Sequence, residues 1–303
     1  MFVIYFDENN SVLPSPLPNP FTTSSQTIKV RLENPIYAVC YEETTIDFKV
    51  REKPTFDVIN EAIICMIDSP ELLISIENPN ENHTYHWTDE NNTIIRNLPT
   101  VRVTKGGVYK VSATSSFNCN SEVQEITIYE SAISTININD IKVIDDSTKN
   151  SIQIDRSNLG IGDYEFRLLN EDLRIIKNYQ DDPIFDNLDG GIYTIEVNDK
   201  NSCGNVTFEV SVVSFPKFFT PNSDGKNDVW HINGISKNFY QSGTVKIFNR
   251  YGKVLAKFFI NDNGWDGTFK GKALPADDYW FYIELLDNRN NFRSRSGNFS
   301  LLR

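Results

Sequence analysis

Two matching segments in the middle of the chain constrain its fold more than any other feature. Residues 106–119 read GGVYKVSATSSFNC and residues 190–203 read GGIYTIEVNDKNSC, so each has paired glycines, a tyrosine, and a cysteine ten residues after that tyrosine. The glycines suit a tight turn, the tyrosine begins a strand, and the cysteine falls in the next hairpin loop. The repeat therefore indicates tandem copies of one β domain.

The rest of the pattern agrees with an all-β fold. Alternating runs such as TIDFKV, YEFRLL and VKIF recur between turn clusters such as ENPNEN and DNRNN, and helical periodicity is almost absent. Short strands at this spacing are typical of β-sandwiches, so we expect tandem immunoglobulin-like sandwiches. In that fold Tyr109 and Tyr193 are corner tyrosines, and Trp87 is the core tryptophan.

The repeat also predicts the domain boundaries. A weaker third copy, TIKVRLENPIYAVC at residues 27–40, keeps the cysteine but lacks the glycines, and its domain lacks N-terminal strands. We therefore expect the sequence to be the C-terminal fragment of a longer exported protein. The expected domains are a truncated immunoglobulin-like repeat, an immunoglobulin-like or PKD-like sandwich, a further immunoglobulin-like sandwich, and a different module at the end: residues 1–53, 54–131, 132–214 and 215–303.

The four cysteines lie at matched loop or strand positions, which fits an oxidising compartment. In a head-to-tail array, the hairpin loop of a sandwich lies at the end where its first strand begins. Cys65, in the opening strand IICMID, is therefore predicted to pair with Cys119. Cys40 and Cys203 find no equivalent partner, and we expect that of Cys40 upstream of the sequence. The alternative is that the cysteines are small buried thiols.

The charge and hydropathy of the chain exclude several classes of partner. The formal net charge of −12 argues against nucleic acid and anionic membrane, because both attract basic surfaces. It suits a neutral or cationic surface or a divalent cation, although solvated secreted proteins are also often acidic. No run approaches the roughly 20 apolar residues of a membrane helix, so we expect no transmembrane segment.

No motif for catalysis is present in the sequence. It has no G-x-S-x-G, no H-E-x-x-H, no C-x-x-C and no phosphate-binding glycine loop. His83 and His86 are three apart on one predicted strand and so face opposite sides of a sheet. Scattered carboxylates leave a glycosidase-type pair open, but small sandwich repeats rarely hold a deep cleft. We expect a protein that is not an enzyme.

One loop has the composition of a cation site. Residues 222–228 read NSDGKND, and Gly225 permits a sharp turn. Calcium prefers hard oxygen donors in a flexible loop, and four side chains here supply them: Asn222, Asp224, Asn227 and Asp228. The alternative is an Asx turn, in which these side chains bond to nearby backbone N–H groups. Calcium is the only cofactor that the sequence suggests, and both interpretations stay open.

Residues 215–303 resemble the gliding motility-associated C-terminal domain. This is the type B sorting domain of cargo of the type IX secretion system in Bacteroidota. The resemblance covers nearly all of that module and rests on four segments in family order: FFTPNSDGKNDVWHINGI, VKIFNRYGKVLAKF, GWDGTFKGKALPADDYWFYIEL and GNFSLLR. The upstream repeats resemble the immunoglobulin-like and PKD-like stalk units of large SprB-like cell-surface adhesins.

The resemblance implies a targeting function. A folded β-sandwich would direct export across the outer membrane through the type IX translocon, and the chain would stay on the cell surface. Retention would depend on an outer-membrane partner of the PorP/SprF-like family, and the adhesin would serve gliding motility or adhesion. Two alternatives are a carbohydrate- or calcium-dependent binding module, and the non-catalytic tail of a secreted hydrolase.

A folded address must present fixed turns and anchoring side chains to its partner. The candidate partner-binding residues are Arg250, Tyr251, Gly252 and Lys253 of the RYGK turn, Trp265 and Asp266 of the GWDG turn, Trp280, and Arg303. The alternative is that these residues only build the sandwich, which we weigh most strongly for Trp280. The run Asp146-Ser147-Thr148 also fits a loose pattern of O-glycosylation in these bacteria.

Overall fold

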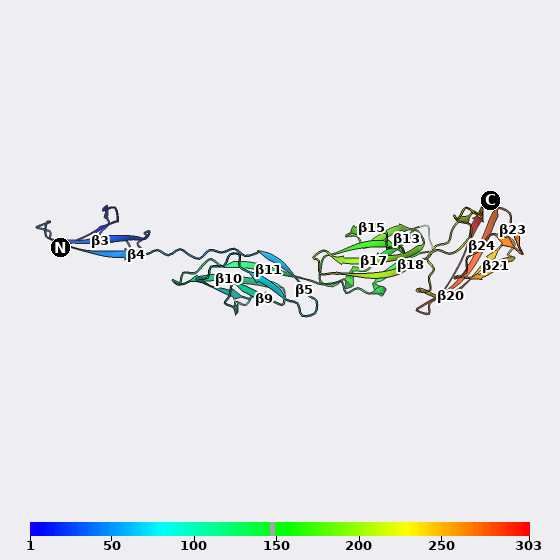
Figure 1. Ribbon diagram of the computed structural model, residues 1–303, viewed down its shortest axis with the longest axis horizontal. Coiled ribbons are helices and arrows are strands. Elements are labelled where there is room, and N and C mark those ends of the chain that lie inside the picture. The colour runs from blue at the N-terminus through cyan, green and yellow to red at the C-terminus, as the bar shows by residue number, and fades with distance from the viewer. Residues whose placement is uncertain (146–148) are drawn as a thin grey trace. The chain divides into compact units, whose positions relative to one another are not determined.

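The computed structural model of the protein describes residues 1–145 and 149–303 (Figure 1). Within these ranges the chain is built from β-strands, and its helices are two single 3-10 turns, η1 (Ile138–Asp140) and η2 (Arg156–Asn158). The predicted all-β class is therefore confirmed. The described part contains no helix long and apolar enough to cross a membrane. The glycosylation pattern at residues 146–148 lies outside the described residues.

The chain divides into two compact units. The first unit comprises Met1–Ala62, Leu72–Val103 and Gly107–Ile128, and the second comprises Ile63–Glu71, Thr104–Gly106 and Tyr129–Arg303. The N-terminal sheet has the order β2-β1-β3-β4, with β1 (Phe2–Phe6), β2 (Val12–Leu13), β3 (Gln26–Glu33) and β4 (Tyr41–Phe48). Ile28 of β3 is fully buried, whereas seven of the eight residues of β4 are exposed.

The next strands form two sheets around Trp87. One sheet has the order β5-β11-β10-β7-β8 and the other pairs β6 with β9. Their bounds are β5 (Glu61–Cys65), β6 (Leu72–Ser75), β7 (His83–Thr88), β8 (Ile94–Arg96), β9 (Thr100–Val103), β10 (Gly107–Ser115) and β11 (Gln124–Ser131). Trp87 is fully buried and its indole N–H donates to the Leu98 carbonyl at 2.9 Å, so its predicted core position is confirmed.

Strands β12–β18 form two further sheets that share one hydrophobic core. The sheets have the orders β12-β13-β16 and β15-β14-β17-β18. Their bounds are β12 (Ile141–Ile144), β13 (Asn150–Ile154), β14 (Tyr164–Asn170), β15 (Ile175–Gln180), β16 (Ile184–Leu188), β17 (Gly191–Asp199) and β18 (Asn205–Val212). Ile152 and Phe166, one from each sheet, belong to this core. The Tyr193 hydroxyl donates to the Asp189 carbonyl at 3.0 Å, which confirms the predicted corner tyrosine.

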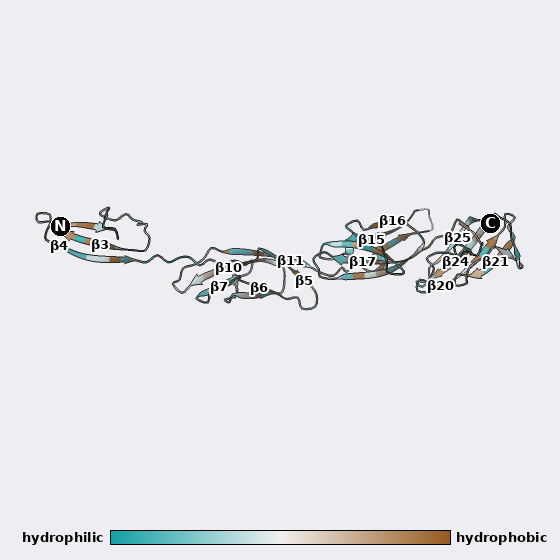
Figure 2. Ribbon diagram, turned by 45° about the horizontal axis from the view of Figure 1, so that its top comes forward, coloured by the Kyte–Doolittle hydropathy of each residue, from teal (hydrophilic) through white to brown (hydrophobic). Residues whose placement is uncertain are grey.

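The C-terminal strands form a five-stranded sheet of order β19-β25-β24-β20-β21 and a small β22-β23 pair. Their bounds are β19 (Phe218–Phe219), β20 (Tyr240–Phe248), β21 (Val254–Phe259), β22 (Thr268–Phe269), β23 (Lys272–Ala273), β24 (Asp277–Asp287) and β25 (Phe292–Leu301). β24 is paired on both sides, and it buries every second side chain: Tyr279, Phe281, Ile283 and Leu285. Figure 2 shows the hydrophobic residues of this part on its strands.

The predicted pairing of Cys65 with Cys119 is wrong. The disulfide joins Cys65 to Cys203, and Cys40 and Cys119 are free. Hydrogen bonds from Thr127 N to Asn60 O and from Met66 N to Ser131 O show that β5 advances along β11 in the same direction. Cys65, at the end of β5, therefore lies where β11 ends, whereas Cys119 lies in the hairpin before β11 begins. The prediction treated Cys65 as if it stood at the beginning of its strand.

Candidate functional site

Several turns meet at one end of the C-terminal sheet, where its strands begin or end. Phe248, the last residue of β20, is opposite Val254 and Trp280 near the starts of β21 and β24, and Asp277 is opposite Leu301 at the end of β25. β19 ends at the same end of the sheet, because it pairs in parallel with the last residues of β25. We call the connections gathered there the turn cluster, which comprises residues 220–228, 249–253, 264–277 and 302–303.

The turn at residues 249–253 is built on one asparagine. Asn249 Oδ1 accepts hydrogen bonds from Tyr251 N at 3.1 Å and Lys253 N at 2.9 Å, and Gly252 supplies the positive φ of +77°. This backbone is fixed by the turn itself, yet the Tyr251 side chain is 85% exposed. The turn therefore presents a large aromatic side chain to solvent from a defined position.

The charged residues of this turn are tied to the neighbouring connections. The Arg250 guanidinium donates to the carboxylate of Asp277, and this hydrogen bond lowers the pKa of Asp277 below its usual value. Lys253 Nζ lies 4.6 Å from the centre of the Phe269 ring, within the range of a cation–π contact. Arg250 and Lys253 thus join the 249–253 turn to the start of β24 and to β22.

The turn at residues 264–267 belongs to the core. Trp265 is only 4% exposed, and its indole N–H donates to the Thr268 carbonyl at 2.9 Å. Gly264 and Gly267 both have positive φ, and a Cβ would lie 2.6 Å from Trp230 O at the first and 2.6 Å from Leu301 Cδ1 at the second. Trp265 therefore builds the sandwich, which was the alternative to a role in binding a partner.

Trp280 and Arg303 take different positions from Trp265. Trp280 projects from the outer face of β24 and is 40% exposed, with Phe248 and Asn298 opposite it on the two flanking strands. The Arg303 side chain turns back onto the cluster, where Nε donates to the Leu274 carbonyl at 3.0 Å. Asp266 Oδ1 accepts from Thr268 N at 2.9 Å and so fixes the approach to β22.

The turn cluster differs in charge from the rest of the chain. It contains six basic side chains and four acidic ones, whereas the chain as a whole has 29 basic and 41 acidic residues. The basic residues are Lys226, Arg250, Lys253, Lys270, Lys272 and Arg303, and the acidic ones are Asp224, Asp228, Asp266 and Asp277. Sequence reasoning missed Phe269, Lys270 and Lys272, although the lysines flanking Gly271 in TFKGKA were a visible signal.

The oxygen atoms of the 222–228 loop bind its own backbone. Asp228 accepts from the N–H groups of Asn222 at 2.9 Å, Ser223 at 2.6 Å and Gly225 at 2.8 Å. A side-chain hydrogen bond from Asn222 lowers the pKa of Asp224, which also accepts from Lys226 N at 2.7 Å. Asn227 contributes its backbone carbonyl, which accepts from Thr220 N at 2.8 Å.

This geometry is that of the Asx turn, the alternative to a calcium loop. Across residues 1–145 and 149–303 the structure groups no three His, Cys, Asp or Glu side chains that could hold a metal ion.

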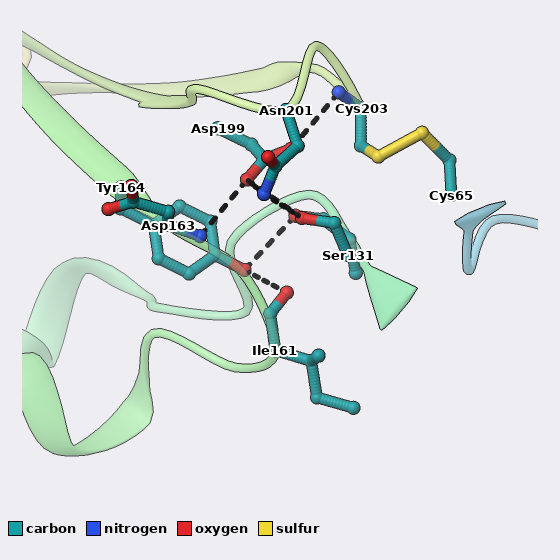
Figure 3. Close-up of a disulfide and its surroundings, with 9 residues drawn as sticks. Cys65, Ser131, Ile161, Asp163, Tyr164, Asp199, Asn201 and Cys203 are labelled. Atoms are coloured by element: carbon teal, nitrogen blue, oxygen red, sulfur yellow. Dashed lines mark hydrogen bonds between the residues drawn. A yellow bond between two sulfur atoms is a disulfide. The ribbon is translucent and has the colours of Figure 1, made fainter. Parts of the chain in front are cut away.

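A second constellation surrounds the disulfide (Figure 3). Asp199, 1% exposed, accepts from Ser131 Oγ at 2.8 Å and from Cys203 N at 3.1 Å, and it also accepts from Asp163 N at 3.2 Å. The Tyr164 hydroxyl donates to the Ile161 carbonyl at 2.8 Å, and burial raises its pKa. A buried carboxylate needs such partners, so this network fixes the β17–β18 loop against the end of β11.

A polar contact fixes the other end of the C-terminal sheet. Arg293, near the start of β25, donates to Asp145 from both terminal nitrogens, at 3.0 and 3.1 Å, and to the Tyr240 hydroxyl at 2.6 Å. Tyr240 begins β20. The contact to the preceding strands therefore lies at the start of β20 and β25, and the turn cluster lies at the ends of these strands.

Comparison with known proteins identifies the C-terminal part. Residues 213–299 match the family model described as CHU_C Type IX secretion signal domain. No curated protein matches the sequence.

Solved structures of low similarity include immunoglobulin domains 1–5 of Sidekick-1, at 13% identity and TM-score 0.33, covering 99% of this chain and 74% of that one. Domains A168–A170 of titin give 12% and 0.37, covering 70% and 88%. Murine CEACAM1b gives 10% and 0.38, covering 52% and 100%. At these values the structures carry no argument about function.

Proposed function

We propose that the type IX secretion signal domain at residues 213–299 is read through its turn cluster by a partner in the outer membrane. A type IX secretion signal directs export across the outer membrane and so implies interaction with the secretion system. Recognition by the partner takes place at one end of the C-terminal sheet, where the turn cluster lies. The chain itself is placed on the cell surface, as the stalk and sorting end of an adhesin without catalytic function.

The observation that carries the proposal is the convergence of the turns. The turns at residues 220–228, 249–253 and 264–277 belong to the segments that resemble sorting domains, and together with Arg303 they lie at the end of the sheet where β20 and β25 end. The turn at Gly234 is the exception, because it lies against Val212. The opposite end of the sheet, where β20 and β25 begin, makes the contact between Arg293 and Asp145. One end of the sheet is thus attached to the preceding strands, and the other is available to a partner.

The chemistry of the turn cluster fits recognition by an acidic surface. Its excess of basic side chains contrasts with the net charge of −12 of the chain. Complementary charge steers association and suppresses wrong partners, and an exposed aromatic side chain such as Tyr251 provides an anchor. We assign the partner to the PorP/SprF-like outer-membrane family and the biological role to gliding motility or adhesion.

The upstream strands supply the stalk in this proposal. We divide the chain into residues 1–53, 54–131, 132–214 and 215–303, with the first three as immunoglobulin-like repeats. The division is supported by the sheets, because β1–β4, β5–β11, β12–β18 and β19–β25 each pair only among themselves in the described residues.

Export of a reporter tests the proposal. Residues 213–303 are fused to a folded periplasmic reporter in a host with the type IX system and the outer-membrane partner, and surface display is measured by protease accessibility. We expect display of the wild-type fusion and its loss when Tyr251, Lys253, Lys270 and Lys272 are replaced by alanine.

The matched control is Lys257→Ala, because Lys257 is an exposed lysine of β21 outside the turn cluster. Full display of the quadruple variant would contradict recognition through the turn cluster. Retention of the wild-type fusion in the periplasm would show that residues 213–303 alone are not the address.

A further inference from the structure

The disulfide closes a large covalent loop. Cys65 is the last residue of β5, and Cys203 lies in the loop between β17 and β18, 138 positions further along the chain. The segment between the two cysteines contains all of the strands from β6 to β17. A covalent path therefore runs from β5 to β18 without passing through any of these strands.

We propose that this disulfide is a tension bypass, which carries force applied at the two ends of the chain past residues 66–202. A covalent bond does not yield when hydrogen bonds break, so tension that enters at Cys65 leaves at Cys203. The strands inside the loop then bear no sustained pull. They remain folded while the strands outside the loop are extended.

The pairing of β5 with β11 shows what the bypass prevents. β5 and β11 run side by side in the same direction, and they are the first and last strands of this sheet in the sequence. A pull on the two ends of an unbridged chain would therefore act on β5 and β11 in opposite directions and shear them apart. With the bridge in place, force crosses only β5 on this side. The strands from β6 to β17, which lie inside the covalent loop, bear the pull only if the disulfide is reduced.

The bridge also protects most of the sheet β15-β14-β17-β18 from a pull on the chain ends. β18 is its edge strand, paired only with β17, and it follows Cys203 directly. Force that enters at Cys203 can therefore peel β18 from β17, but it does not load β14, β15 or β17 from their chain ends. Extension of the oxidised chain is limited to β1–β5 and β18–β25.

Hydrogen bonds and close packing hold the segments that carry Cys65 and Cys203 next to each other. Asp199 accepts from the Cys203 amide and from Ser131 Oγ (Figure 3). Met66 N donates to the Ser131 carbonyl at 2.7 Å. A Cβ on Gly204, which has φ of +131°, would lie 2.9 Å from Ile133 Cγ1. The β17–β18 loop thus packs closely against the segment that follows β11, so the bridge joins segments that are already adjacent.

The length withheld from extension follows from the chain geometry. A fully extended chain spans at most about 3.3–3.6 Å per residue, so a separation of 138 residues corresponds to about 480 Å of contour length. This length is released only by reduction. Reduction therefore changes how far the protein can be stretched, and the redox state of its surroundings sets its extensibility.

Stretching of single molecules tests the proposal. The whole chain is held by handles attached enzymatically at both termini and pulled until no further unfolding occurs, with and without a reducing agent. We expect the reduced chain to reach a contour length about 480 Å greater than the oxidised chain. The Cys203→Ser variant should show the longer contour in both conditions.

The matched control is Cys119→Ser, because Cys119 is a free thiol in the corresponding hairpin loop of the preceding repeat. This variant should keep the short contour when oxidised and the long one when reduced. Equal contour lengths of the oxidised and reduced wild-type chains would overturn the proposal. A non-reducing peptide map in which Cys65 is joined to any residue other than Cys203 would overturn it as well.

Discussion

Two tryptophans that look alike in the sequence should respond in opposite ways to replacement by alanine. Trp265 is 4% exposed and its ring lies 5.2 Å from that of Tyr279 and 5.6 Å from that of Phe219, whereas Trp280 is 40% exposed on the outer face of the sheet. We expect Trp265→Ala to destabilise the C-terminal strands strongly. Trp280→Ala should leave their stability nearly unchanged.

The magnitudes follow from burial. Removing a buried tryptophan costs about 3–5 kcal/mol in lost packing, and here the Thr268 carbonyl also loses its indole donor. Such a loss is a large part of the roughly 5–15 kcal/mol that stabilises a domain. For Trp280, which is partly exposed on the outer face of the sheet, we expect a loss of about 1 kcal/mol or less.

Hydrogen exchange in the whole chain measures both changes. Amides of β24 and β25 exchange through opening of this sheet, so a loss of 3–5 kcal/mol accelerates them by about 100-fold to several thousandfold. Trp280→Ala should accelerate them by less than about tenfold. Amides of β17 serve as an internal reference, which neither variant should change. Acceleration of β24 and β25 by less than tenfold in Trp265→Ala would refute the core position of this side chain.

Three further predictions concern the rest of the chain. Under native conditions a thiol reagent should label Cys40 and Cys119 only, and mass spectrometry should find the two bridged cysteines labelled only after reduction. Burial and a contact with Glu196 raise the pKa of Tyr179 to about 12. The neutral phenol of Tyr179 therefore stabilises the fold below pH 10, and this contribution falls as the pH rises from about 10 to 12. In a titration followed by absorbance at 295 nm, the Tyr179→Phe variant should lack the component near pH 12 that the wild-type chain shows. Asp228→Ala removes the acceptor of three backbone N–H groups and should lower the thermal midpoint by an amount equivalent to about 0.5–2 kcal/mol, with or without calcium. A rise of the wild-type midpoint on addition of millimolar calcium would by itself contradict the Asx-turn interpretation.

Much of the fold follows from local patterns in the sequence. Alternation in DYWFYIELLD correctly assigned Tyr279 and Phe281 to one face of β24 and Trp280 to the other, because side chains alternate across a strand whatever its neighbours are. The spacing from Gly-Gly to Tyr predicted the corner tyrosine Tyr193 for a similar reason, since both features belong to a single turn and the strand after it. The turns of the C-terminal domain were also recognisable one by one.

The sequence could not show which of these local features meet. GWDG and DYWF both read as candidate contact sites, but only the tertiary structure buries Trp265 and leaves Trp280 exposed, because burial depends on the strands that pack above each ring. The basic character of the turn cluster was equally hidden. Its residues come from three separate connections and from residues 302–303 after β25, and the order and direction of the strands bring them to one end of the sheet.

The cysteines separate what the sequence determines from what only the tertiary structure decides. The sequence determined that Cys65, Cys119 and Cys203 stand at the ends of strands or in hairpin loops, since spacing from the nearest tyrosine or strand run fixes such positions. It did not determine their partners. That depended on β5 running along β11 in the same direction, which carries Cys65 to the end of β11 and to the loop of Cys203. Strand direction is a property of pairing between distant segments, and no local pattern encodes it.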